Sequence, residues 1–173
     1  MPSRLGRDNS EGSDGGKTVQ FPAITGSNLQ RRKLELPAEL EGDLNLVLIA
    51  FQQWQQSQVD TWMPFARQLE TDHPGFRTYE LPTIQWLNPL ARTFINEGMR
   101  AGIPDPATRE RTITLYLDKS AFRKALQLSS EENIYALLLN REGQVLWRAE
   151  GAYSRERGES LAAAVQEVSC ETE

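Results

Sequence analysis

Apolar positions along the chain recur with two different periods, which predict alternating strands and helices. A continuous apolar run at residues 46–51 is typical of a strand that is covered on both faces. Residues 112–117 alternate strictly between polar and apolar side chains, as half-buried strands do. Gly143, between two apolar runs, predicts an antiparallel hairpin with a left-handed residue in its turn. The other strand candidates are residues 33–36, 76–81, 134–139 and 144–148.

Four apolar stripes at helical spacing lie between or after these strands. We expect the first helix to begin with Ser57 as its N-cap and the third to begin with Asp118. The second is expected to begin at Asn88, which is followed by a proline, and to end at Gly98, with a loop over residues 99–111. The stripes are Val59, Trp62, Met63, Ala66 and Leu69; Leu87, Leu90, Phe94 and Ile95; Phe122, Ala125 and Leu126; and Leu161, Val165 and Val168.

This order of elements predicts an α/β layered fold, with a mostly parallel sheet and an antiparallel edge. Residues 18–169 are expected to form this domain, in which Trp86 and Trp147 are core or half-buried. Residues 1–17 are polar and rich in Gly and Ser, so we expect a disordered tail. Residues 170–173 are expected to be a short C-terminal tail.

Composition and charge argue against several classes of function. A net charge of −5 and a pI near 5.1 argue against general nucleic-acid binding, which requires a positive face. No apolar run approaches the ~20 residues of a membrane span, and residues 1–16 lack a signal or anchor pattern. A cytoplasmic location, at most peripheral to a membrane, is expected. Cys170 and His73 are the single cysteine and histidine, so no cofactor, metal site or catalytic residue is predicted.

The element order resembles the thioredoxin-like superfamily. Redox members of that superfamily carry Cys-x-x-Cys after the first central strand and an active-site proline before the hairpin. With the Met63–Pro64 pair matched to their motif, the two cysteine positions hold Gln56 and Val59, and Ile134 replaces the proline. The resemblance implies a three-layer fold, with a mixed central sheet flanked by helices. Thiol–disulfide exchange requires a thiolate, so the substitutions imply that this chemistry is absent.

Several short sequence motifs, which occur in a fixed order, carry a closer resemblance to a second family. They are residues 31–37, 46–51, 94–100, 105–111 and 114–119, together with Phe122. In these motifs the chain resembles the ATP10-like assembly-factor family of the mitochondrial F-type ATP synthase and its bacterial relatives. That family implies a chaperone-like role, in which a membrane-embedded subunit of the synthase is held until it joins the rest. The partner implied is therefore a protein.

A glutamine-rich turn follows the first central strand, where ligands commonly bind in α/β sheets. Glutamine offers donors and acceptors without charge, and Trp54 adds a flat apolar surface that could anchor a partner. The alternatives are that the polar residues merely cap the helix and that Trp54 points into the core. Arg100 joins the candidates through the family resemblance. The candidate protein-binding residues are Gln52, Gln53, Trp54, Gln55, Gln56 and Arg100.

Three functions stay open on this basis. The main hypothesis is a redox-inactive interaction or assembly factor. The second is a peroxiredoxin- or thiol-reductase-type enzyme with a displaced thiol, for which Cys170 is the single candidate. The third is a small-molecule binding module at the glutamine-rich turn.

Overall fold

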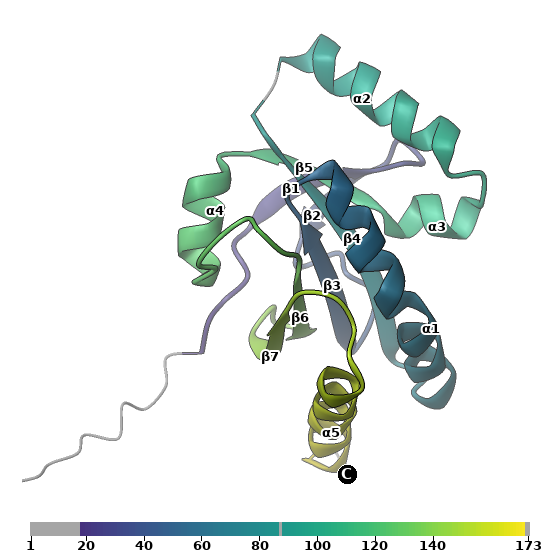
Figure 1. Ribbon diagram of the computed structural model, residues 1–173, viewed down its shortest axis with the longest axis vertical. Helices are drawn as coiled ribbons and strands as arrows, with labels where there is room; N and C mark the ends of the chain where they lie inside the picture. The colour runs from purple at the N-terminus through teal and green to yellow at the C-terminus, as the bar shows by residue number, and fades with distance from the viewer. Residues whose placement is uncertain (1–17, 87, 172–173) are drawn as a thin grey trace, which may run out of the picture.

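A computed structural model describes residues 18–86 and 88–171, so the tail predicted for residues 1–17 lies outside the described residues (Figure 1). Within them, seven strands form one sheet in the order β2-β1-β5-β4-β3-β6-β7. The strands are β1 (Ile24–Asn28), β2 (Lys33–Leu36), β3 (Leu44–Ala50), β4 (Phe76–Gln85), β5 (Ile113–Leu117), β6 (Tyr135–Asn140) and β7 (Val145–Glu150). The helices are a 3₁₀ turn, η1 (Gln53–Gln55), and α1 (Gln56–Asp72), α2 (Pro89–Gly102), α3 (Pro106–Arg111), α4 (Lys119–Leu126) and α5 (Arg155–Glu171).

The sheet is mixed, and its three parallel strands lie side by side in the middle. β3 pairs with β4 and β4 with β5 in parallel, while β6 and β7 extend the sheet from β3 in antiparallel order. β1 and β2 extend the other side, also antiparallel. The carboxyl ends of β3, β4 and β5 therefore meet at one edge, in the upper part of Figure 1. This arrangement confirms the predicted α/β fold with a mixed central sheet flanked by helices.

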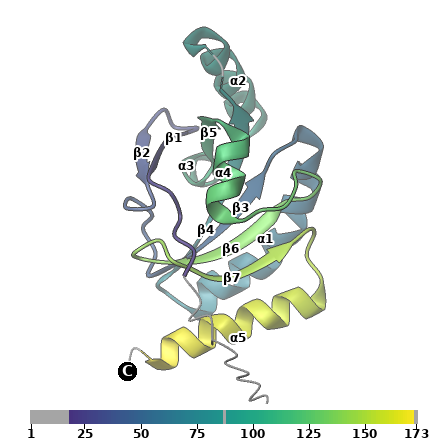
Figure 2. The same ribbon diagram turned by 90° about the vertical axis from the view of Figure 1, so that its left-hand side faces the viewer.

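Successive residues of β3 point to opposite faces of the sheet, and both faces are covered. Leu46 and Leu48 belong to an apolar cluster with residues of α1 and α5. Val47 and Ile49 belong to a second cluster, which includes residues of α4 and β2. The three layers are seen edge-on in Figure 2. The continuous apolar run arises because a strand between two helical layers has no solvent-facing side.

Several boundaries differ from the sequence-based prediction. α1 begins at Gln56 after the 3₁₀ turn, so Ser57 is not its N-cap and instead donates to the Trp54 carbonyl oxygen (3.1 Å). α2 continues past Gly98, because a glycine inside a helix lowers helix propensity without ending the helix. The expected loop of residues 99–111 contains the end of α2 and the short helix α3. α5 includes Cys170, which was expected in a tail.

Two glycines give a matched test of this fold. Gly143 has a φ of +79° in the β6–β7 turn, and a Cβ there would overlap Pro37 Cγ. We expect Gly143→Ala to destabilise the protein by about 1–2 kcal/mol, because an L-residue is strained at this φ and has no room. Gly98→Ala, with open space around its Cβ in α2, should not destabilise and should add helix propensity. Urea unfolding of both variants measures the difference, and equal effects would contradict the analysis.

Candidate functional site

The predicted glutamine-rich turn lies at the carboxyl end of β3, where it is held by its own side chains. Gln55 is fully buried, and its Oε1 accepts hydrogen bonds from the backbone N–H of Phe51 (2.8 Å) and of Gln52 (3.2 Å). Its Nε2 donates to the carbonyl oxygen of Glu131 (2.6 Å), in the segment before β6. Gln55 is therefore a structural tie between three segments and is not free to bind a partner.

A second glutamine, one turn into α1, fills the position opposite the hairpin. Gln58 Oε1 accepts from the backbone N–H of Ile134 (3.0 Å), and Gln58 Nε2 donates to Asn133 Oδ1 (2.9 Å). An extended peptide bound beside Ile134 would need that same N–H group. The turn and the hairpin start do face each other, but the polar groups between them are already paired within the chain.

The two positions that hold cysteine in redox members have no reactive side chain here. Gln56 is exposed, and its Nε2 donates to Asp60 Oδ1 (2.9 Å) and lies 3.5 Å from Glu80 Oε2. Val59 is buried in the apolar cluster between α1, β3 and α5. Glu80, on β4, is only 9% exposed, and this burial raises the pKa of its carboxyl, with the charge of Asp60 adding to the effect.

Trp54 and Arg100 are not brought together. Trp54 lies on the 3₁₀ turn and is 58% exposed, so the alternative that it is a core residue is wrong. Arg100 lies near the end of α2, and its carbonyl oxygen accepts from Arg109 Nη2 of α3 (2.8 Å). No interaction in the described residues links Arg100 to Gln52–Gln56, so the two parts of the predicted surface are separate.

α2 is attached to the body through its polar side. The Tyr116 hydroxyl of β5 lies 2.7 Å from Asn96 Oδ1 and 3.2 Å from the Arg92 carbonyl oxygen. The Arg92 guanidinium stacks over the rings of Tyr116 and Trp86, 4.8 and 5.1 Å from their centres. Glu97 accepts two hydrogen bonds from Arg31 in the β1–β2 turn, both 3.0 Å long. These contacts fix the orientation of the helix.

Two apolar residues of α2, Leu90 and Phe94, consequently face outward, whereas Ile95 and Met99 are half-buried. Leu90 and Phe94 are 83% and 82% exposed, and none of the described α2 residues is buried. Trp86, just before the helix, is 64% exposed, so the prediction that it is a core or half-buried residue is wrong. The spacing of the stripe defines an apolar face of the helix but not the direction in which that face points. Arg92, Asn96 and Arg100, spaced by four along the opposite side, were the signal for a polar attachment.

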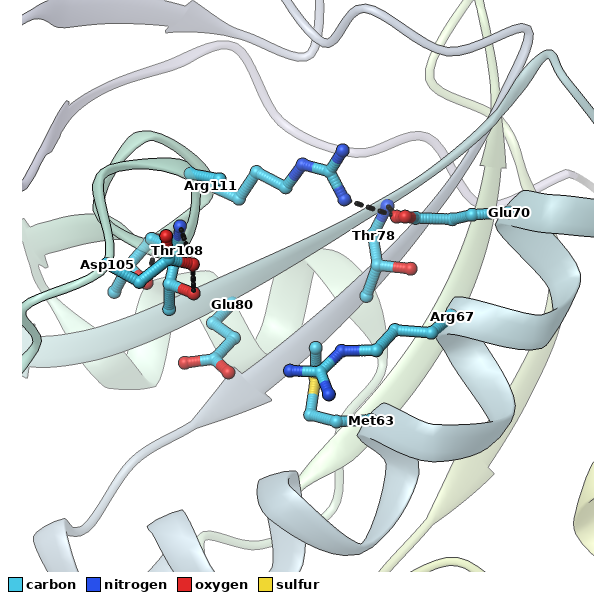
Figure 3. A pocket seen from close by; sticks show the side chains of 10 residues that line it. Met63, Arg67, Glu70, Thr78, Glu80, Asp105, Thr108 and Arg111 are labelled. Atoms are coloured by element: carbon cyan, nitrogen blue, oxygen red, sulfur yellow. Dashed lines mark hydrogen bonds and ion pairs between the residues drawn. The ribbon is translucent and has the colours of Figure 1, made fainter.

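A cleft of about 160 Å³ opens between α1, β4 and α3 (Figure 3). Glu70 of α1 closes part of it by accepting from Arg111 Nη1 (2.6 Å) and from the backbone N–H of Thr78 (3.0 Å). Figure 3 shows Arg67 extending from α1 toward the side of Glu80. The lining residues include no Cys, His or Lys, so this cleft lacks a thiol, imidazole or amine nucleophile.

Two further properties concern metals and membranes. Among residues 18–86 and 88–171, no cluster of three or more His, Cys, Asp or Glu side chains is placed to hold a metal ion. In the same part of the chain, no helix is both long and apolar enough to cross a bilayer.

The Gln55 tie generates a stability prediction. Gln55→Ala should destabilise the protein by about 1–3 kcal/mol, because the buried N–H group of Phe51 and two partly buried groups, the Gln52 N–H and the Glu131 carbonyl oxygen, lose their partner. Gln53→Ala, in the same turn but exposed, is the matched control and should change the free energy of unfolding by less than about 0.5 kcal/mol. Urea unfolding measures both variants. Equal losses would show that Gln55 does not hold the turn.

Burial of Glu80 predicts a pH dependence. Because its pKa is raised in the folded state, the folded state binds this proton more tightly than the unfolded state, and stability falls as pH rises through the folded pKa. Glu80→Gln should therefore raise the melting temperature at neutral pH. The gain should disappear below the ordinary glutamate pKa of about 4.3, where the wild-type carboxyl is protonated in both states. The exposed Glu132→Gln is the control, and a destabilised Glu80→Gln at neutral pH would contradict the prediction.

Solved structures share this fold. Yeast Sco1 with copper bound has a TM-score of 0.60 at 12% identity, covering 87% of this chain and 95% of that one. BsSco, a member of the Sco family of cytochrome c oxidase assembly proteins, has a TM-score of 0.57 at 11% identity, covering 86% of this chain and 94% of that one. The exposed lipoprotein thioredoxin Etrx1 from Streptococcus pneumoniae has a TM-score of 0.53 at 10% identity, covering 84% of this chain and 99% of that one. These likenesses confirm the thioredoxin-like fold and, at such identities, nothing beyond the fold.

The sequence comparisons identify the family. No curated protein matches the chain in sequence at a significant level. A family profile described as ATP10 protein matches residues 14–168, which include the glutamine-rich turn, α2 and the β6–β7 hairpin. Since this match spans most of the 173 residues, the chain belongs to the ATP10 protein family.

Proposed function

We propose that this protein is a redox-inactive assembly factor for an F-type ATP synthase, which holds a membrane-embedded subunit until that subunit joins the complex. Membership of the ATP10 protein family supports the assembly role. The observation that carries the absence of redox chemistry is the hydrogen-bonded arrangement at the start of α1. There, Gln56 and Val59 occupy the two cysteine positions, and the Gln58 side chain pairs with the backbone N–H of Ile134.

Thiol chemistry at this corner has no side chain to perform it. Exchange requires a thiolate that attacks a disulfide sulfur, and a carboxamide or an isopropyl group cannot do so. Cys170 is exposed in the last turn of α5, and the end of α5 lies at the opposite end of the molecule from the start of α1 (Figure 1). These observations favour binding over catalysis.

Trp54 is the proposed contact for the held subunit. It protrudes from a turn that is fixed by Gln55, so little conformational freedom is lost when a partner covers the ring. An exposed aromatic side chain on a rigid turn is a suitable anchor for an apolar protein segment. Gln52 and Gln53, exposed on either side of the turn's start, can donate and accept hydrogen bonds at the rim of that contact.

Trp54→Ala tests the contact. We expect the variant to bind the synthase subunit roughly 30-fold more weakly, the equivalent of about 2 kcal/mol for a lost aromatic anchor. Its melting temperature should stay unchanged, because the ring is exposed. Binding is measured by capture from detergent-solubilised membranes, followed by mass-spectrometric identification of the captured chain. Leu146→Ala, which truncates an exposed apolar side chain on β7, is the control.

Three outcomes would contradict the proposal. Normal capture by folded Trp54→Ala would move the contact elsewhere on the surface. Insulin reduction or peroxide turnover by the wild type, lost in Cys170→Ser, would establish the enzyme alternative with a displaced thiol. Stabilisation of the melting transition by a small molecule, without capture of any synthase subunit, would favour the binding-module alternative.

A further inference from the structure

We propose that α2 docks this protein on the surface of an anionic lipid bilayer, with Leu90 and Phe94 in the headgroup region. The proposal concerns a different surface from the Trp54 contact. It rests on three features of the described structure: the outward apolar side of α2, its projection from the body, and the basic residues around it.

The orientation of α2 is fixed, so its apolar side cannot turn inward without loss of specific contacts. Asn96 is hydrogen-bonded to Tyr116, Arg92 stacks on two aromatic rings, and Glu97 pairs with Arg31. Leu90 lies about 200° around the helix from Arg92, given 3.6 residues per turn. The polar contacts with the body and the exposed leucine are thus on nearly opposite sides of one helix.

The shape of this region fits a deformable partner. α2 stands away from the sheet at one end of the molecule in both views (Figures 1 and 2). Leu90 and Phe94 are more than four-fifths exposed, so the helix presents a convex ridge. A bound peptide would instead need a groove to occupy. Helices that lie in a bilayer interface carry Leu, Phe and Trp on the inserted side, to a depth of about 5–10 Å. Trp86, exposed just before α2, adds an aromatic side chain suited to the headgroup level.

The charges around α2 select an anionic surface. The chain as a whole carries −5, yet residues 31–33 and 89–111 together contain seven basic and three acidic residues. Glu39 and Glu70, which pair with Arg32 and Arg111, reduce this positive excess but do not cancel it. The pairing of Arg31 with Glu97 places the basic β1–β2 turn beside α2. Arg32 in that turn, which pairs with Glu39 (3.5 Å), and Lys33 at the start of β2 are both exposed. Each Lys or Arg near an anionic membrane surface strengthens binding, and the effect decreases with salt.

Vesicle flotation of the full-length protein tests the proposal. The protein should float with vesicles of equal parts phosphatidylglycerol and phosphatidylcholine at low salt, and much less with pure phosphatidylcholine. Leu90→Ser/Phe94→Ser should weaken partitioning onto the anionic vesicles by about tenfold or more, because two apolar side chains no longer insert. Its melting temperature should match the wild type, since both side chains are exposed. Leu146→Ser, on β7, is the matched control and should bind as the wild type does.

A charge-matched pair of double variants tests the third feature, the basic residues around α2. Arg32→Gln/Lys33→Gln should weaken binding to anionic vesicles roughly fivefold for each charge removed at low salt. Arg148→Gln/Arg155→Gln removes the same charge from β7 and α5 and should have little effect.

Three results would overturn the proposal. The first is failure of the wild type to float with anionic vesicles. The second is flotation of Leu90→Ser/Phe94→Ser to the same extent as the wild type. The third is loss of subunit capture in that variant when the wild type does not bind vesicles at all. The last result would assign the α2 surface to a protein partner. Capture through Trp54 in detergent extract is measured independently, so either proposal can fail while the other stands.

Discussion

The buried amide of Gln55 joins three parts of the fold that are distant in the sequence or differ in structure. A primary amide has two donors and an acceptor, and in a buried position each must find a partner. Here the acceptor holds the backbone N–H groups of Phe51 and Gln52 and a donor holds the carbonyl oxygen of Glu131. The end of β3, the start of α1 and the segment before β6 are therefore fixed together. The corner at which related folds carry reactive sulfur is, in this chain, a hydrogen-bonded joint.

This joint also explains why Trp54 is exposed. With Gln55 turned inward, its neighbour on the short 3₁₀ turn points away from the core. Lys119 strengthens the same region by donating from Nζ to the Phe51 carbonyl oxygen (2.8 Å) and by pairing with Glu131 (3.1 Å). The turn that carries Trp54, which we propose as a contact for a partner, is thus rigid, and a rigid surface loses little entropy when it is covered.

The sequence was most informative where structure is decided locally. β3 was recognisable because its run of apolar residues is what a strand covered on both faces needs. Asp118 was recognisable as an N-cap because an aspartate directly before a helical stripe is a common cap. In the structure its side chain accepts from the backbone N–H groups of Ser120 and Ala121. The role of Gln58 was not recognisable, because its partner at Ile134 is 76 residues away in the chain. The direction of the apolar side of α2 was equally hidden, since it depends on Tyr116 and Arg31, which come from other strands and turns.

The mode of attachment of α2 affects how the molecule opens. A helix that buries apolar side chains in a core separates only when the core itself is disrupted, at nearly the full free energy of unfolding. No described residue of α2 is fully buried, and water can replace most of the hydrogen bonds and cation–π contacts that hold the helix. Its amide protons should therefore exchange with solvent through a local opening, while those of β3 exchange through global unfolding. We therefore expect α2 to unfold as a cooperative unit of its own, separately from the thioredoxin-like sheet and the helices packed on it.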